Sequence, residues 1–261
     1  MATVRPPAVA GLFYPEQREE LARTVDALLA GAQAAGPPPK AIVAPHAGYV
    51  YSGPVAATAY AALRPLAGRI ERVVLLGPSH RVPFDGLAAP STDYFRTPLG
   101  DVPVDREAIE SIRDLPQVCI LDEAHALEHS LEVHLPFLQR VLGGFRLVPL
   151  VVGDAAPEEV AEVIERLWGG DETLIVVSSD LSHYHDYHTA RRMDAATSMA
   201  VEALAPERIG YEQACGRHPL QGLLVAARRR GLQARTLDLR NSGDTAGPRD
   251  RVVGYGAYAF H

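Results

Sequence analysis

The sequence has few cysteines, no long apolar run and no excess of basic residues. Its two cysteines, Cys119 and Cys215, are too few for a disulfide framework, which favours a reducing compartment. No apolar run reaches the ~18–20 residues that cross a bilayer, and the first residues lack the apolar core of a signal peptide. These absences predict a cytoplasmic protein with no membrane partner.

The charge balance argues against binding to nucleic acids. The chain carries 25 Lys and Arg against 32 Asp and Glu, a net charge of −7, whereas binding to a phosphate backbone requires a net basic face. Its only basic run, Arg228–Arg230, follows an apolar stretch. We expect this run to end a helix, where cations interact favourably with the helix dipole. The sequence therefore predicts no nucleic-acid partner.

The rest of the composition is typical of a folded globular protein. Of the 261 residues, 47% are hydrophobic and 22% are charged. A chain of this length buries about three quarters of the surface of its unfolded form, so it can build a large core without disulfides. No Ser/Gly/Pro linker and no internal repeat divides the sequence. We therefore predict a single domain over residues 1–261.

Short apolar segments alternate with amphipathic segments along the chain. The apolar segments are typical of buried strands: Lys40–Ala44, Arg72–Leu76, Gln117–Leu121, Leu147–Val152, Thr173–Val177, Leu232–Leu239 and Val252–Phe260. The helical patterns between them cover Pro15–Ala32, Ser52–Leu63, Asp105–Arg113, Ser130–Leu142, Pro157–Trp168, Thr189–Leu204 and Pro219–Arg230. This alternation predicts an α/β fold with a mostly parallel sheet, covered by helices on both faces. We expect the last strand to be antiparallel.

Polar loops follow three of the predicted strands, and each loop brings a histidine. His46 and His80 follow the first two strands, and Asp180 and His183 follow Thr173–Val177. Because the carboxyl ends of parallel strands meet at one edge of a sheet, we expect these side chains to converge. Imidazole nitrogen and carboxylate oxygen are ligands of divalent transition metals, which predicts a shared metal or catalytic site. Taken singly, each histidine also fits a loop residue held by hydrogen bonds.

Cys215 lies just before the predicted helix at Pro219. A helix N-terminus lowers the pKa of a thiol, and the neighbouring Arg217 and His218 would add to this effect. The position suits a metal-binding thiolate or a nucleophile, while a small buried apolar residue is the alternative. Cys119, inside a predicted strand, is expected to lie in the core.

The segment His125–His129 matches the H-x-x-E-H pattern of inverted zinc peptidases. On a helix, the two histidines would share a face and Glu128 would serve as the base. Ser130 is typical of a helix cap, however, so the helix is expected to begin after the pair. A polar helix start is then the competing interpretation for Glu128, Glu132 and His134, and a supporting role beside a metal is a third.

Six motifs together resemble the Memo family, whose prokaryotic members form the AmmeMemoRadiSam system protein B group. They occur in family order and extend over nearly the whole chain: Arg5–Pro15, Ala44–Tyr49, Gly77–His80, Glu128–Pro136, Ser179–His183 and Cys215–Pro219. The resemblance implies a three-layer α/β/α sandwich with a mixed sheet. This fold is similar to that of the LigB-type class III non-haem iron extradiol dioxygenases, which have a metal pocket at the sheet edge.

The resemblance also implies a set of ligands. His46, His80 and Cys215 match family positions that bind iron or copper, and zinc accepts the same donors. Asp180 and His183 match residues that line the same pocket. We expect His183 to act as a general acid–base and Asp180 to orient it or a bound water. The dioxygenases have a glutamate in place of Cys215, and this departure weighs against ring cleavage.

Three functions follow as hypotheses. The first is metal-dependent oxidoreductase or dioxygenase chemistry on an unidentified substrate. The second is a binding module with a vestigial metal pocket that recognises a peptide or a partner enzyme. The third is a hydrolase that uses the H-x-x-E-H arrangement or a Cys215–histidine pair. Family gene neighbourhoods also imply an AMMECR-type protein and a radical SAM enzyme as partners.

Overall fold

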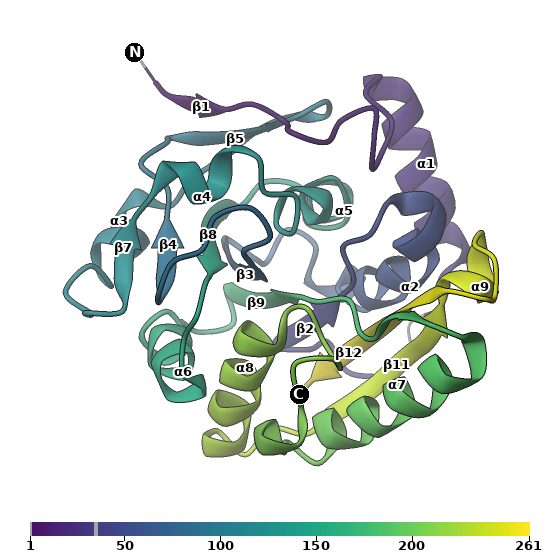
Figure 1. Ribbon diagram of the computed structural model, residues 1–261. Helices are drawn as coiled ribbons and strands as arrows, with labels where there is room; N and C mark the ends of the chain where they lie inside the picture. Colours follow the sequence, from purple (N-terminus) through teal and green to yellow (C-terminus); the bar gives the residue numbers. More distant parts are fainter. Residues whose placement is uncertain (1, 34–35) are drawn as a thin grey trace.

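A mixed β-sheet lies at the centre of the molecule, between two layers of helices (Figure 1). This computed structural model describes residues 2–33 and 36–261, and within these ranges the central sheet has nine strands. The predicted α/β fold with three layers is confirmed.

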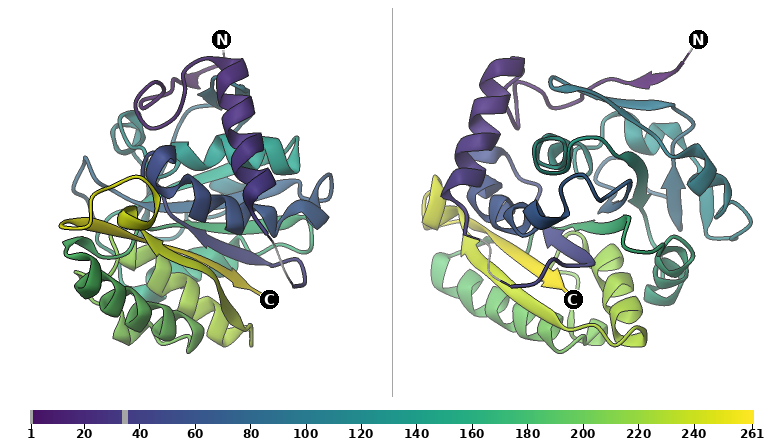
Figure 2. Two further views of the ribbon diagram at one scale, coloured as in Figure 1. Left: turned by 90° about the vertical axis from the view of Figure 1, so that its right-hand side faces the viewer. Right: turned by 180° about the vertical axis from the view of Figure 1, so that it is seen from behind.

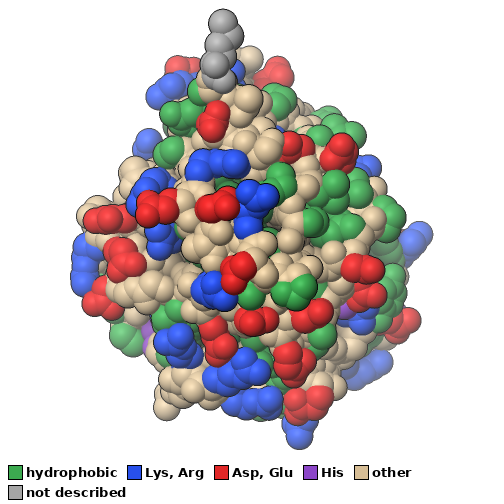
Figure 3. Space-filling model, turned by 90° about the vertical axis from the view of Figure 1, so that its left-hand side faces the viewer, with side chains coloured by type: hydrophobic (Ala, Val, Ile, Leu, Met, Phe, Trp, Pro, Cys, Tyr) green, Lys and Arg blue, Asp and Glu red, His purple; other side chains and the backbone are tan. Residues whose placement is uncertain are grey.

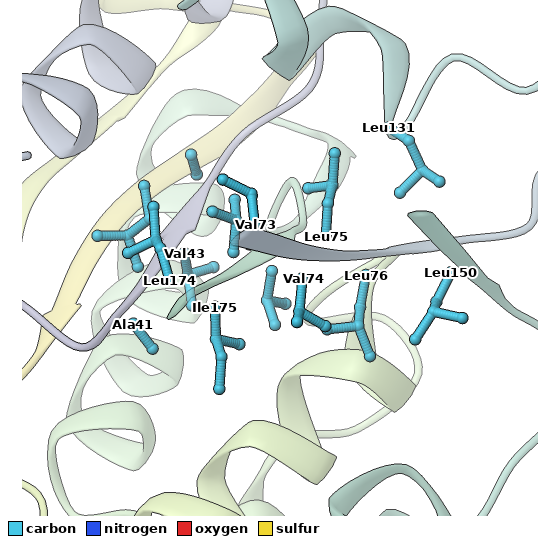
Figure 4. Close-up of a cluster of buried hydrophobic side chains, with 14 of the residues drawn as sticks. Ala41, Val43, Val73, Val74, Leu75, Leu76, Leu131, Leu150, Leu174 and Ile175 are labelled. Atoms are coloured by element: carbon cyan, nitrogen blue, oxygen red, sulfur yellow. The ribbon is translucent and has the colours of Figure 1, made fainter. Parts of the chain in front are cut away.

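Four parallel strands form the middle of this sheet. In spatial order they are β2 (Ala41–Ala44), β9 (Thr173–Ser178), β3 (Arg72–Pro78) and β8 (Arg146–Val152). Almost all of their residues are buried. Figure 4 shows Val73 and Leu75 on one side of β3, and Val74 and Leu76 on the other. Continuous apolar runs form these strands because helices cover both faces of the sheet.

Antiparallel pairing extends the sheet on both sides. β12 (Val252–Phe260) pairs antiparallel with β2, and both β11 (Ala234–Asn241) and β10 (His183–His185) pair with β12. On the other side, β4 (Leu87–Ala89) runs antiparallel to β8 and parallel to the edge strand β7 (Val118–Ile120). The antiparallel direction predicted for the last strand is therefore confirmed.

Helices cover the two faces of the sheet (Figures 1 and 2). One layer contains α1 (Arg18–Gly31), α2 (Tyr49–Ala61) and α5 (Leu135–Leu142), and the other contains α6 (Pro157–Arg166), α7 (Tyr187–Glu202) and α8 (Arg217–Arg229). Shorter helical segments lie in the connections: α3 (Arg106–Glu110), α4 (Asp122–Ala126), α9 (Ser242–Thr245), η1 (Arg64–Leu66), η2 (Glu132–His134) and η3 (Pro206–Arg208). α1 buries Leu21, Val25 and Leu29, which is the apolar face that their spacing indicates.

Several helices begin a few residues from the predicted positions, and for α2 and α5 the difference involves a serine that was expected to cap the helix. α2 begins at Tyr49, because the Ser52 hydroxyl donates to the carbonyl of Ala47 and does not cap the helix. α5 begins at Leu135, because the Ser130 hydroxyl donates to a carbonyl at the end of β3. In the sequence, both serines are typical of helix caps. In the folded chain, their hydroxyls donate to backbone carbonyls instead of capping a helix.

Cys119 is exposed, so the prediction that it lies in the core is wrong. It lies on β7, a three-residue strand whose partner in the described chain is β4. Of the residues in β7 only Val118 is buried. An apolar segment in the sequence does not reveal whether its strand lies at the centre or at the edge of a sheet.

The N-terminal segment, residues 4–14, is attached to the rest of the molecule by buried charged groups. Its strand β1 (Val4–Arg5) belongs to a small second sheet with β5 (Tyr94–Thr97) and β6 (Gly100–Pro103). The buried Arg5 forms an ion pair with the buried Glu132. Glu132 also accepts hydrogen bonds from the backbone amides of Ala8 and Val9 and from the hydroxyl of Tyr14.

The surface carries charges of both signs. Acidic and basic side chains are interspersed on the face drawn in Figure 3. In residues 2–33 and 36–261, no helix combines the length and the apolar character needed to cross a membrane.

Candidate metal centre

The carboxyl ends of β2, β3 and β9 meet at one edge of the sheet, because these strands are parallel neighbours. The loops that follow them open into a cleft of about 1210 Å³. The N-terminal end of α8 reaches the same edge, since the backbone N–H of Cys215 donates to the carbonyl of Asp180. All five residues singled out in the sequence line the cleft: His46, His80, Asp180, His183 and Cys215.

Three potential ligand atoms converge in this cleft. One donor atom from each of His46, His80 and Cys215 can be chosen so that all three lie within 4.8 Å of one another. The Cys215 Sγ is 3.3 Å from the His46 Nε2, and the centroids of the two imidazole rings are 5.1 Å apart. Two imidazole nitrogens and one thiolate sulfur suit zinc, copper or ferrous iron. These residues therefore form a group that could hold a metal ion.

His46 is buried, and Ser178 holds its ring at Nδ1. Its Nδ1 lies 2.6 Å from the Oγ of Ser178, and the Ser178 hydroxyl donates to the carbonyl of Ser130 over 2.6 Å. Burial, reinforced by the neighbouring His80, lowers the pKa of His46 well below its usual value. The ring is therefore neutral at physiological pH, which is the form that binds metals.

His80 is more open to the cleft and is held by Glu128. The Glu128 carboxylate accepts hydrogen bonds from the backbone N–H of His80 at 2.6 Å and from its ring Nδ1 at 2.8 Å. It also accepts from the amides of His129 and Ser130. Burial opposes the ionisation of Glu128, but the hydrogen bonds from His80 and the amides outweigh it and lower the pKa to about 2.

A second group, His80, Glu128 and His129, also brings potential ligand atoms within 4.8 Å of one another. The Glu128 carboxylate of this group is already engaged, however, because its two oxygens together accept the four hydrogen bonds described above. We therefore interpret Glu128 as a support for His80 rather than as a ligand of a second ion.

The thiol of Cys215 is buried, which raises its pKa, and the carboxylate of Asp180 adds to this effect. The lowered pKa expected from the helix N-terminus is therefore wrong for the protein without a bound cation. The Sγ also accepts a hydrogen bond from the backbone N–H of Asp180 at 3.3 Å. A bound cation would favour the thiolate, because a coordinating thiol loses its proton.

Asp180 is buried and lines the cleft. Its Oδ1 accepts a hydrogen bond from the backbone N–H of His46 at 2.8 Å, and its Oδ2 lies 4.0 Å from the His46 Nε2. Burial raises the pKa of Asp180 to about 6, although His183 and nearby backbone amides act against this shift. Among the described residues, Asp180 makes no hydrogen bond to His183. The His183 ring is held instead by the carbonyl of Leu181, 2.8 Å from Nδ1.

A bulge shapes the strand that carries His183. Tyr184 has a φ of 63°, a left-handed conformation that is rare for a bulky side chain. The pairing of β10 with β12 shifts register between His183 and His185. Such bulges re-aim side chains, and both histidines line the cleft. His185 is half-exposed at the cleft.

Two residues near the ligand group were not singled out in the sequence for this role. Ser178 supports His46, as described above. The ring of His129 stacks on that of His80, with centroids 4.7 Å apart and planes 19° apart, and lies 5.5 Å from the His46 ring. The Glu128–Pro136 motif, which contains His129, is the signal that could have placed this residue in the site.

The H-x-x-E-H pattern does not form a peptidase site. His125 lies in α4, is buried, and its ring Nε2 lies 2.9 Å from the carbonyl of Ala88. In the described ranges His125 belongs to neither group that could hold a metal. The two histidines of the pattern are therefore not paired on one helical face.

Fold and site together define an α/β protein with a candidate metal centre at the carboxyl edge of its sheet. The profile of the family described as Memo-like protein matches residues 5–259, and the chain belongs to this family, as the six motifs predict.

Relatives over nearly the full length support this assignment. The chain is 39% identical to a MEMO1 family protein of Aeropyrum pernix, covering 97% of this chain and 98% of the relative. It is 38% identical to a MEMO1 family protein of Aquifex aeolicus, covering 97% of each. A solved structure titled as uncharacterized protein JW3007 from Escherichia coli K12 has a similar fold, with a TM-score of 0.55 and 12% identity over 84% of this chain and 98% of that one.

Proposed function

We propose that this protein binds iron or copper through His46, His80 and Cys215, and uses the metal in oxidoreductase or dioxygenase-type chemistry on a small molecule. The observation that carries the proposal is the meeting of three donor atoms from separate parts of the chain within 4.8 Å. Zinc suits the same donors but has no redox chemistry.

The cleft supports a role beyond holding an ion. A bound iron or copper would supply redox chemistry and polarise a bound molecule. The volume of about 1210 Å³ leaves room for a substrate next to the ligand group. Aromatic side chains line much of it: Phe13, Tyr51, Phe84, Tyr184, Tyr211 and Tyr255.

His183 is the candidate for proton transfer. Its Nδ1 is engaged by the carbonyl of Leu181, so its Nε2 is the atom available to a molecule in the cleft. Asp180 fixes the backbone of His46 and supplies a carboxylate oxygen near the ligand group, where it can orient a water.

A non-catalytic binding module is the second candidate. Exposed apolar side chains at the cleft favour it, since Tyr184 is 65% and Tyr211 79% exposed. A hydrolase is disfavoured, because Glu128 is filled by hydrogen bonds and burial keeps Cys215 protonated. The cytoplasmic location and the AMMECR-type and radical SAM partners remain predictions.

Metal analysis tests the proposal. We expect protein purified without oxygen and incubated with ferrous or cuprous ions to retain close to one ion per chain. The double variant His46→Ala, His80→Ala should lose it. His188→Ala, which removes an exposed histidine outside the cleft, should retain it. A wild-type protein that retains neither ion would contradict the proposal. Oxygen consumption that depends on His183 would exclude the purely binding alternative.

A further inference from the structure

One short segment, Glu128–Ser130, supports both histidines of the candidate centre, since the Glu128 carboxylate holds His80 and the Ser130 carbonyl accepts from the Ser178 hydroxyl beside His46. We propose that Glu128 and Ser178 are positioning residues that keep the ring hydrogens of His80 and His46 on Nδ1, so that both Nε2 lone pairs face Cys215. The role of this arrangement in binding rests on the proposed metal function. The positions of the two ring hydrogens can nevertheless be measured without a metal.

The Ser178 hydroxyl determines the tautomer of His46. A hydroxyl has one hydrogen, and that of Ser178 is directed to the carbonyl of Ser130, an atom that can only accept. Its oxygen is therefore left as an acceptor for the His46 Nδ1, 2.6 Å away. The ring must donate from Nδ1, and in a neutral imidazole this leaves Nε2 as a lone pair. That lone pair lies 3.3 Å from the Cys215 Sγ.

Glu128 determines the tautomer of His80 in the same way. An ionised carboxylate only accepts hydrogen bonds, so the His80 Nδ1 at 2.8 Å must donate to it. The amides that also reach this carboxylate hold it in place. Such carboxylate–histidine pairs fix ring orientation and raise the basicity of the ligand in metal sites.

The supporting segment is itself packed without spare space. The Arg5 guanidinium donates to the carbonyl of Glu128 at 2.6 Å. On the other side, a Cβ added at Gly77 would lie 2.8 Å from both the Ser130 Oγ and the Leu131 Cδ2, so only glycine fits at this point of β3. The ring hydrogens of His46 and His80 are therefore in place before an ion binds. Binding then requires no free energy to reorganise the two rings.

The first test uses imidazole 15N NMR of the metal-free protein. In spectra recorded on the neutral rings, we expect wild-type His46 and His80 to carry the hydrogen on Nδ1. In Ser178→Ala, His46 should populate the Nε2–H form. In Glu128→Gln, His80 should populate its Nε2–H form, because the single oxygen of a glutamine amide cannot accept all four hydrogen bonds that the Glu128 carboxylate accepts. Ser130→Ala is the matched control, since it removes a buried hydroxyl of the same network and keeps the carbonyl that receives Ser178.

The second test measures the affinity for Zn²⁺ by competition with a chelator. Ser178→Ala and Glu128→Gln should bind about 10–100-fold more weakly than the wild type, and Ser130→Ala within about threefold of it. Wild-type tautomers retained in both folded variants would overturn the inference, even if the protein binds metal. Correct tautomers in a protein that binds no metal would instead overturn the proposed function. Should Ser178→Ala not fold, Glu128→Gln measured at His80 decides the inference.

Discussion

Gly216 has no room for a side chain, and this affects its neighbour Cys215. A Cβ at Gly216 would lie 2.4 Å from the carbonyl oxygen of Ser178 and 2.7 Å from the Cβ of Ser179. The backbone of α8 can therefore approach the end of β9 only because glycine stands here. The same close approach brings the Cys215 thiol to the ligand group, so the glycine in the Cys215–Pro219 motif has a physical reason beyond the turn.

Asp105 shows how a single buried charge can stabilise the fold far from the cleft. Its side chain is fully buried, accepts a 2.8 Å hydrogen bond from Arg72 and caps α3 through the amide of Ala108. Burial opposes its ionisation, but these hydrogen bonds and the charge of Arg146 outweigh burial and lower its pKa. The ionised form therefore stabilises the native state above the usual carboxyl pKa, and this contribution is lost as pH falls through the lowered value.

We expect Asp105→Asn to lower the free energy of unfolding by about 2 kcal/mol at pH 7. The difference from the wild type should shrink below about pH 4, because protonation then removes the same charge from the wild type. Urea unfolding at pH 7 and pH 3 measures both values. Asp114→Asn, at an exposed ion pair with Arg166, should change little at either pH. A difference that grows on acidification would contradict this account.

Among the elements, strands and the loops after them were the most predictable parts of this chain. The parallel strands β2, β3 and β9 are apolar along most of their length, and proline or glycine marks the ends of β2 and β3, so these strands could be identified from local sequence. Parallel pairing then brings their carboxyl ends to one edge, which predicts the meeting of His46 and His80 without coordinates.

Features that depend on contacts between distant segments were not predictable. The start of α5 differs because the Ser130 hydroxyl is used by β3, and Cys119 is exposed because its strand lies at the sheet edge. The raised pKa of Cys215 follows from burial, which its sequence neighbours do not reveal. Likewise, Ser178 is an ordinary strand residue until the fold places it behind the His46 ring.

The attachment of the N-terminal segment includes a buried ion pair between Arg5 and Glu132. Arg5→Ala would leave the buried Glu132 without its charged partner, and breaking a buried pair costs about 3–5 kcal/mol. We expect this loss in the free energy of unfolding measured with urea. Arg96→Ala is the control on the same small sheet, because the Arg96–Asp101 pair is half-exposed and should contribute less than about 1 kcal/mol. Equal effects of the two substitutions would show that burial does not strengthen the Arg5 pair.

At the scale of the whole molecule, the ligand group connects parts of the chain that only the fold brings together. The loop after β2, the loop after β3 and the start of α8 each contribute one donor. In the unfolded chain these donors are about 35 and 135 residues apart by their sequence numbers, so a disordered chain has no comparable site. A metal that binds the native state and not the unfolded state must stabilise the whole fold.

We therefore expect the metal to raise the melting temperature of the wild type. At a free concentration 100 times the dissociation constant, the gain is about 2.7 kcal/mol, which corresponds to roughly 5–10 °C for a chain of this size. Differential scanning calorimetry with and without Zn²⁺ measures the shift. Cys215→Ser should lose most of it, because an alcohol is a poor ligand where a thiolate is required. Cys119→Ser removes the exposed thiol on β7 and should retain the full shift. If both serine variants respond alike, the stabilisation comes from sites other than the cleft, and the three donors do not act together.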